Sequence, residues 1–226
     1  LNSGAHASIT LTNDPTLVDG TIYTVTFDAT DAAGNAATTV TNTAVTYDAS
    51  APTAAITYDS AGPYKSGTVV RITATFNEAM ADSPVTQIAI SGANTQSATV
   101  MTKTDTTHYY YDHTVGAGDG TATVALSIGE DLSGNVITSA PTSGADFTVD
   151  NTVPVITTTL PATSSTVNNT TVYYTLSETV ASGTITFTRT GGTADGSSPH
   201  AQALTGSELN SGAHASITLT NDPTLV

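Results

Sequence analysis

The stretch Val69–Phe76, VVRITATF, alternates between apolar and polar side chains. Its even-numbered positions are all apolar: Val70, Ile72, Ala74 and Phe76. Arg71, Thr73 and Thr75 lie between them. Because successive side chains of a strand point to opposite faces, this period of two predicts a β-strand with one buried face and one solvent-facing side.

Similar short segments lie on both sides of this strand. They are separated by turns rich in Gly, Asp and Asn, such as 59–62, 92–94, 116–120 and 131–135. The chain also holds more than forty threonines, whose β-branched side chains favour strands over helices. The sequence therefore predicts an all-β protein, with about seven short strands between residues 51 and 152, the fourth of them at Val100 and Met101. This number and spacing of strands is typical of an immunoglobulin-like β-sandwich.

An internal repeat sets the organisation of the chain. Leu1–Val18, LNSGAHASITLTNDPTLV, occurs again letter for letter as Leu209–Val226, at an offset of 208 residues. We interpret the sequence as one period of a tandem array plus a short overlap. Half a period is about 104 residues, the size of one immunoglobulin-like domain. We therefore expect tandem sandwiches of two alternating types.

Two linkers place the domain boundaries. In each, an aspartate follows a predicted strand and a proline comes four residues later: Asp48 and Pro52, then Asp150 and Pro154. Proline lacks an N–H group, so it is tolerated where an edge strand begins. We expect three parts. Residues 1–50 are the C-terminal half of a type A domain, residues 51–152 are a complete type B domain, and residues 153–226 are the N-terminal part of the next type A domain.

Acidic residues dominate the charged side chains. The chain has 19 Asp and Glu, four Lys and Arg, and a net charge of −15. This balance argues against a nucleic-acid partner and favours multivalent cations, of which calcium prefers oxygen ligands. The absence of cysteine excludes disulfides and thiolate metal sites. No apolar run approaches the length of a membrane span. No catalytic motif stands out either, and we therefore expect no enzymatic activity.

Three short motifs recur in the same order in both domain types. Phe76–Glu78 and Leu176–Glu178 each follow a predicted second strand, Asp131–Asn135 and Asp31–Asn35 each follow a predicted sixth strand, and an Asp-to-Pro linker closes both domains. This arrangement resembles the bacterial Ig-like (BIg-type) tandem repeats of giant surface adhesins and other large repetitive exported proteins. The resemblance implies an extracellular location on the bacterial cell surface.

The expected sandwich brings several acidic residues to each junction between domains. In an immunoglobulin-like fold, the loops after the second and sixth strands reach the end of the domain at which the first strand begins. Glu78 and Asp131 should therefore lie beside Asp48 of the linker, with Glu130 and Asn135 nearby. Closely spaced carboxylates repel one another, and a bound Ca²⁺ would offset this repulsion with an all-oxygen shell.

The same reasoning extends to the neighbouring junctions. Asp150 and Glu178 would belong to the next site, and Asp31 with Asn35 would be the counterpart of the Asp131 turn one period earlier. The alternative is that all of these side chains are solvated turn residues, because Asp and Asn favour turns through local hydrogen bonds.

Three functions remain open from the sequence. The first is an extracellular adhesin stalk stiffened by calcium at its interdomain junctions, with neighbouring repeats of the same chain or of like chains as partners. The second is a subunit of a self-assembled filament or sheath, in which half-domains of successive chains complete one another head to tail. There, the duplicated stretch would compete for one strand position. The third is a glycan- or cell-binding module, for which Tyr110 is the outward-facing aromatic candidate.

Overall fold

The computed structural model describes residues 10–217. These residues form antiparallel strands and one short 3₁₀ helix, η1 (Gly206–Leu209), so the all-β prediction is confirmed. The chain divides into two compact units, unit 1 (Leu1–Asn151) and unit 2 (Thr152–Val226).

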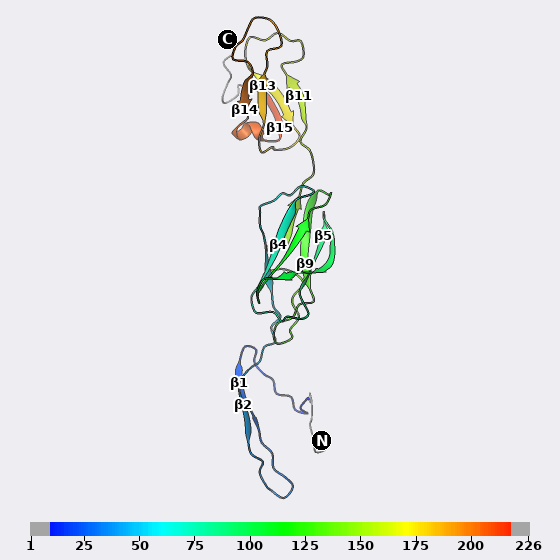
Figure 1. Ribbon diagram of the computed structural model, residues 1–226, viewed down its shortest axis with the longest axis vertical. Coiled ribbons are helices and arrows are strands. Elements are labelled where there is room, and N and C mark those ends of the chain that lie inside the picture. The colour runs from blue at the N-terminus through cyan, green and yellow to red at the C-terminus, as the bar shows by residue number, and fades with distance from the viewer. Residues whose placement is uncertain (1–9, 218–226) are drawn as a thin grey trace. The chain divides into compact units, whose positions relative to one another are not determined.

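Two four-stranded sheets make up the larger part of unit 1 in a sandwich-like arrangement (Figure 1). The first sheet has the order β3-β4-β8-β7, and the second has the order β10-β9-β5-β6. The strands have these bounds: β3 Ala54–Tyr58, β4 Val69–Phe76, β5 Gln87–Gly92, β6 Gln96–Val100, β7 Thr102–Lys103, β8 His108–Thr114, β9 Gly120–Ser127 and β10 Asp146–Val149.

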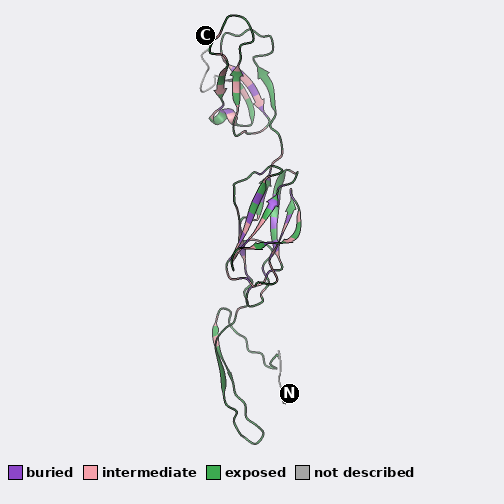
Figure 2. Cartoon of the chain, in the orientation of Figure 1, coloured by how far each residue is buried: buried purple, intermediate pink, exposed green. Residues whose placement is uncertain are grey.

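One hydrophobic core lies between these two sheets. The four even-numbered apolar residues of β4 are all buried, whereas Arg71 is exposed, as the period of two predicts. Ile88 of β5 and Val124 and Leu126 of β9 belong to the same buried cluster from the second sheet. Figure 2 shows the buried segments on the strands of this sandwich. The alternation in the sequence therefore identifies the inner face of β4 correctly.

The structure differs from the sequence prediction at Met101. The sequence predicts one short strand at Val100 and Met101, but β6 ends at Val100 and pairs with β5, whereas β7 begins at Thr102 and pairs with β8. Buried Met101 lies between the two strands and donates its backbone N–H to the carbonyl oxygen of Thr86 (2.9 Å). The chain changes sheet at this residue, so two strands stand where one is predicted.

A separate two-stranded sheet precedes the sandwich. β1 (Ile22–Phe27) pairs with β2 (Val40–Thr46), and Phe27 lies opposite Val40. Cross-strand partners share one face of a hairpin, so one face of this hairpin is apolar. Its side chains are nevertheless exposed, as Figure 2 shows along both strands: Val25, Phe27, Val40 and Val45.

Unit 2 contains one three-stranded and one two-stranded sheet. The three-stranded sheet has the order β11-β12-β15, and β13 pairs with β14. The bounds are β11 Ile156–Leu160, β12 Val172–Leu176, β13 Thr184–Phe187, β14 His200–Ala203 and β15 Gly212–Ile217. Among the described residues of this unit, the buried hydrophobic cluster has four members: Val172, Tyr174, Leu176 and Leu204. Unit 2 thus has a much smaller core than the sandwich of unit 1.

Candidate metal centre

The turn after β9 fixes the first acidic side chain of the centre. Asp131 Oδ1 accepts hydrogen bonds from the backbone N–H groups of Ser133 (2.7 Å) and Asn135 (2.9 Å), and Oδ2 accepts one from the Asn135 side-chain amide (2.8 Å). Gly134 has a φ of 91°, a left-handed conformation that glycine adopts without strain. The Asp-x-x-Gly-Asn motif therefore closes a tight turn around a buried carboxylate.

The turn after β4 carries the second acidic side chain, Glu78. The preceding residue, Asn77, binds Thr53 twice: its Oδ1 accepts the Thr53 backbone N–H (2.7 Å), and its own backbone N–H donates to the Thr53 carbonyl oxygen (3.0 Å). Two residues after Glu78, Met80 forms an isolated antiparallel bridge with Asp131. This bridge places the turn of Glu78 beside the turn of Asp131.

The third acidic side chain, Asp48, comes from the linker that follows β2. Its Oδ2 accepts a hydrogen bond from the Ser133 hydroxyl (3.2 Å), and its backbone carbonyl accepts one from the Asn135 side-chain amide (3.2 Å). Its Oδ1 accepts the backbone N–H of Ser50 (3.1 Å). The linker is therefore bonded directly to the turn that carries Asp131.

The three acidic side chains meet at one place. One carboxylate oxygen from each of Asp48, Glu78 and Asp131 lies within 4.8 Å of the other two. Burial raises the pKa of Glu78, and the negative charges of Asp48 and Asp131 raise it further. Burial also opposes ionisation of Asp131, but the hydrogen bonds from Asn135 and the turn backbone outweigh it and lower the pKa of Asp131. The centre therefore concentrates negative charge that a cation would offset.

The chemistry of these ligands restricts the choice of cation. The converging atoms are carboxylate oxygens, without nitrogen or sulfur. Calcium takes oxygen ligands at about 2.3–2.6 Å, so two ligand oxygens on opposite sides of the ion lie about 5 Å apart. The separations in this cluster, 4.8 Å or less, fall within that span. This all-oxygen donor set is therefore of the kind that Ca²⁺ takes, and it would supply three of the six to eight oxygens that the ion binds.

The turn at Asp31 repeats this local geometry without the cluster. Asp31 Oδ1 accepts the backbone N–H groups of Ala33 (2.9 Å) and Asn35 (2.8 Å), and Oδ2 accepts the Asn35 side-chain amide (2.8 Å). Asp31 is exposed, however. Within residues 10–217, one group of three acidic or metal-ligating side chains converges, and it consists of Asp48, Glu78 and Asp131. The motif builds the turn, and the centre also requires the linker and the loop after β4.

The other predicted ligands lie elsewhere. Glu130 adjoins Asp131, but its carboxylate is not one of the three that converge. Asp150 belongs to unit 1, where its backbone N–H donates to the Tyr64 carbonyl oxygen (2.9 Å), and Glu178 belongs to unit 2. Glu178 Oε1 is buried and has no hydrogen-bond partner among the described residues. A cation shared by Asp150 and Glu178 stays a prediction.

Two contributors to the centre escape the sequence patterns. One is Ser133, whose hydroxyl binds Asp48. The other is Asp19, which accepts hydrogen bonds from the Ala49 backbone N–H (2.6 Å) and the Ser50 hydroxyl (2.5 Å) and so shapes the linker. The feature that could have identified Asp19 is its position just before β1, because this places it at the same end of the hairpin as residues 48–50.

Two further side chains, those of His113 and Tyr110, have structural roles. His113 of β8 is buried, and its Nε2 lies 3.0 Å from Asn94 Oδ1, whereas His108 lies on the opposite face of the strand. Tyr110 faces outward, but the guanidinium of Arg71 lies 4.1 Å from the centre of its ring. One face of this ring is therefore already covered.

No protein-family model matches this chain, and comparisons with curated proteins and with solved structures also give no match. Within residues 10–217, no helix has the length and apolar character needed to cross a membrane. The geometry of the acidic centre is therefore the main guide to function.

Proposed function

We propose that this chain is a structural repeat segment of a long extracellular bacterial surface protein, an adhesin stalk whose immunoglobulin-like domains are joined at calcium-binding junctions. One observation carries this proposal: Asp48, from the linker, converges with Glu78 and Asp131, from two loops of the sandwich that follows. A cation held by all three would tie the linker to that domain.

Sheet topology supports the immunoglobulin-like part of the proposal. In an immunoglobulin-like sandwich, strands A, B, E and D form one sheet, and strands G, F and C, extended by C′, form the other. The observed orders β3-β4-β8-β7 and β10-β9-β5-β6 correspond to these two sheets. Glu78 then lies in the B–C loop and Asp131 in the F–G loop, which reach the same end of such a domain.

Calcium would stiffen the junction for an electrostatic reason. Without a cation, three neighbouring carboxylates repel one another and favour separation of the linker from the sandwich. With Ca²⁺, each carboxylate becomes a ligand, and the linker is fixed to the domain. Calcium sites of extracellular modules bind with Kd values of about 10⁻⁴–10⁻³ M, which suits a partly exposed site of this kind. Near-identical repeats then add length to the stalk.

Calcium-competed terbium luminescence of the full chain tests this proposal. Glu78→Gln is expected to weaken calcium binding at least about tenfold, because it removes one of three charged ligands. Glu130→Gln is the matched control, since it removes the same charge next to Asp131 but outside the converging group. Equal weakening in both variants would indicate diffuse charge attraction and contradict a calcium site at the junction.

A different observation supports a second candidate function, that of a subunit of a self-assembled extracellular filament or sheath. The apolar face of the β1–β2 hairpin is exposed, and the strands of unit 2 leave an open apolar groove. A glycan- or cell-binding function gains no comparable support, because Arg71 covers one face of the Tyr110 ring.

A further inference from the structure

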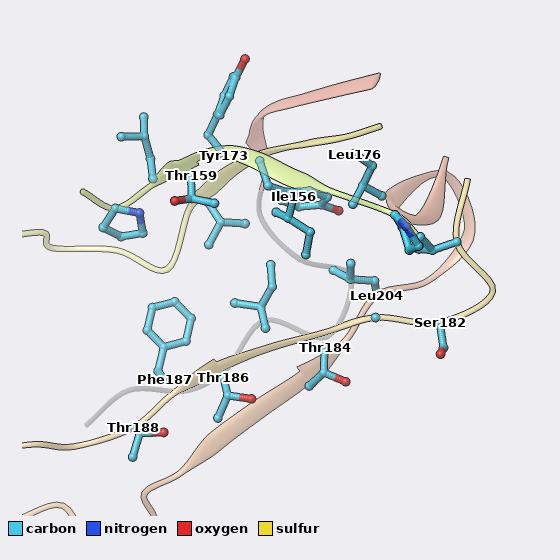
Figure 3. A pocket seen from close by; sticks show the side chains of 18 residues that line it. Ile156, Thr159, Tyr173, Leu176, Ser182, Thr184, Thr186, Phe187, Thr188 and Leu204 are labelled. Atoms are coloured by element: carbon cyan, nitrogen blue, oxygen red, sulfur yellow. The ribbon is translucent and has the colours of Figure 1, made fainter. Parts of the chain in front are cut away.

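An open apolar groove lies between the two sheets of unit 2 (Figure 3). Its volume is about 670 Å³, and it is lined largely by β11, β12 and β13. Figure 3 shows Phe187 pointing into this space, whereas Thr186 and Thr188 of the same segment point away from it. In layered folds, each sheet buries its apolar face against another element, so this groove is the inner face of an incompletely covered sandwich.

The sandwich of unit 1 shows which strands would complete unit 2. In unit 1, β5 pairs with β6 on one side and with β9 on the other. In unit 2, β13 pairs with β14, and no described strand pairs with its other edge. The sheet β11-β12-β15 of unit 2 corresponds to the strands β3-β4-β8 of unit 1. In both, the second strand along the chain is flanked by the other two, and a turn that contains a glutamate follows it: Glu78 after β4 and Glu178 after β12. Unit 2 thus has no described counterparts of β9 and β10.

Side-chain exposure reflects this difference. Ala54 of β3 is 3% exposed, whereas Ile156 of β11, which like Ala54 pairs with the last residue of the central strand, is 63% exposed. The two strands hold corresponding edge positions beside β4 and β12. The apolar residue of β11 is therefore exposed because the sheet that would cover it has two strands instead of four.

We propose that the β1–β2 hairpin of a second copy of this sequence binds in this groove, with its β1 paired to β13 in the place that β9 holds beside β5. The hairpin has the required sequence features. β1 leads into the turn Asp31–Asn35 as β9 leads into Asp131–Asn135, and the two turns have the same hydrogen bonds. The connection after β9 is one residue longer, since Leu126 precedes Asp131 by five residues and Phe27 precedes Asp31 by four. The inference rests on the filament function proposed above and names its partner and contact surface.

The apolar face of the hairpin is open to such a contact. Its side chains are 37–57% exposed: Val25, Phe27, Val40 and Val45. A buried aromatic side chain covers about 150–250 Å², so covering Phe27 alone would remove about 100 Å² from water.

The same orientation brings opposite charges to one end of the interface. Arg189 follows β13 and is the one Lys or Arg between residues 152 and 226. With Ile185 opposite Phe27, Arg189 lies opposite Tyr23, and Asp19 lies four residues before Tyr23. The guanidinium of Arg189 donates to the carbonyl oxygens of Thr193 and Gly192, so its attraction to Asp19 acts over a distance and not as an ion pair.

The duplicated stretch does not compete for a strand position in this arrangement. β15, which belongs to the second copy of that stretch, already pairs with β12 as β8 pairs with β4. A second copy of the sequence therefore has to supply only β1 and β2.

Unit 1 also predicts the register of the new pairing. Ile88 of β5 lies opposite Leu126, the last inward residue of β9. Phe27 is the last apolar residue of β1, and Ile185 is the first of β13. The same register therefore places Ile185 of one copy opposite Phe27 of the other.

Cysteine cross-linking tests this register, because the chain has no cysteine of its own. Chains carrying Thr26→Cys are mixed with chains carrying Thr186→Cys under mild oxidation, since the register places these outward residues opposite each other, with Cα atoms about 5 Å apart. Thr41→Cys with Thr186→Cys is the matched control, because Thr41 pairs with Thr26 and lies one strand farther from β13. The first pair is expected to give at least about tenfold more mixed disulfide. Equal yields would overturn the register.

Sedimentation of the full chain supplies an independent measurement. Val25→Asp places a charge on the apolar face and is expected to weaken self-association at least about tenfold, whereas Thr24→Asp on the opposite face preserves it. Failure here would leave the calcium centre untouched, because its three acidic residues all lie in unit 1. A chain that stays monomeric at all concentrations, or a Thr26→Cys/Thr186→Cys double variant that cross-links only within one chain, would overturn a second copy as the occupant of the groove.

Discussion

Replacing Glu78 by glutamine is expected to have two opposing effects on stability. In the absence of a cation, the change removes a charge whose carboxylate oxygen lies within 4.8 Å of those of Asp48 and Asp131. In the presence of calcium, it removes a ligand. The variant is therefore expected to be more stable than the wild type in chelator and to gain less stability from calcium.

The size of the first effect follows from the geometry of the cluster. Two unit charges at the 4.8 Å limit of the cluster repel by about 0.9 kcal/mol in a water-like dielectric. Physiological salt reduces this repulsion to about half, because its screening length is about 8 Å. Relief of two such pairs gives Glu78→Gln about 1 kcal/mol of additional stability in chelator.

The size of the second effect follows from ligand linkage. A cation present at a hundred times its Kd stabilises the folded wild type by about 2.7 kcal/mol. If the variant binds calcium tenfold more weakly, the same calcium concentration adds about 1.4 kcal/mol. The increment from calcium therefore falls to about half, although the variant begins from a higher stability.

Urea unfolding followed by circular dichroism, with calcium and with chelator, measures both effects. Glu130→Gln is the control and is expected to keep the wild-type increment, because its carboxylate lies outside the converging group. An equal calcium increment in the wild type and in Glu78→Gln would refute the assignment of Glu78 as a ligand. A loss of stability in chelator would refute the repulsion between the three carboxylates.

Three other changes test the sandwich. Ile72→Ala, at a fully buried position of β4, is expected to lower the free energy of unfolding by about 2–5 kcal/mol in urea titrations. Gly144→Ala is expected to lower the melting temperature more than Gly34→Ala, because both glycines have positive φ but a Cβ at Gly144 would lie 2.0 Å from the Ile56 carbonyl oxygen. Burial lowers the pKa of His113 below 6.5 in the folded protein, so the unfolded chain takes up a proton at a higher pH than the folded one. The free energy of unfolding of the wild type therefore falls as the pH drops below 6.5. In unfolding measured at several pH values, His113→Gln is expected to lose this contribution to the pH dependence.

Parity along a strand can be predicted from sequence because it is local. The alternation in Val69–Phe76 identifies the buried side of β4, since every second side chain of a strand faces the same way. The change of sheet at Met101 depends on contact with Thr86 and the core, which no local period contains. Parity also identifies Val45 as part of an apolar face, but its exposure shows that parity does not reveal whether a covering sheet is present.

The acidic centre is predictable where topology decides it. Glu78 and Asp131 could be placed beside Asp48 because the sandwich topology fixes which loops share one end of a domain. Asp19 and Ser133 could not be identified in this way, since their hydrogen bonds to the linker join residues 31 and 85 positions apart and depend on the path of the linker.

The two proposed contacts are connected through one continuous segment. Asp48 lies two residues after the end of β2, so the position of this ligand depends on the hairpin. An isolated two-stranded hairpin is only marginally stable in water, and the apolar face of this one is exposed. Insertion into the groove of a second copy would order the hairpin and thereby hold Asp48 in place for calcium.

Thermodynamic linkage turns this connection into a measurement. If association strengthens calcium binding, calcium must strengthen association by the same factor. Sedimentation of the wild type is therefore expected to show tighter self-association in calcium than in chelator, and Glu78→Gln is expected to lose this difference. Val25→Asp is expected to associate weakly under both conditions. Equal wild-type association with and without calcium would refute the coupling, because it would mean that the hairpin holds Asp48 equally well whether or not its apolar face is covered.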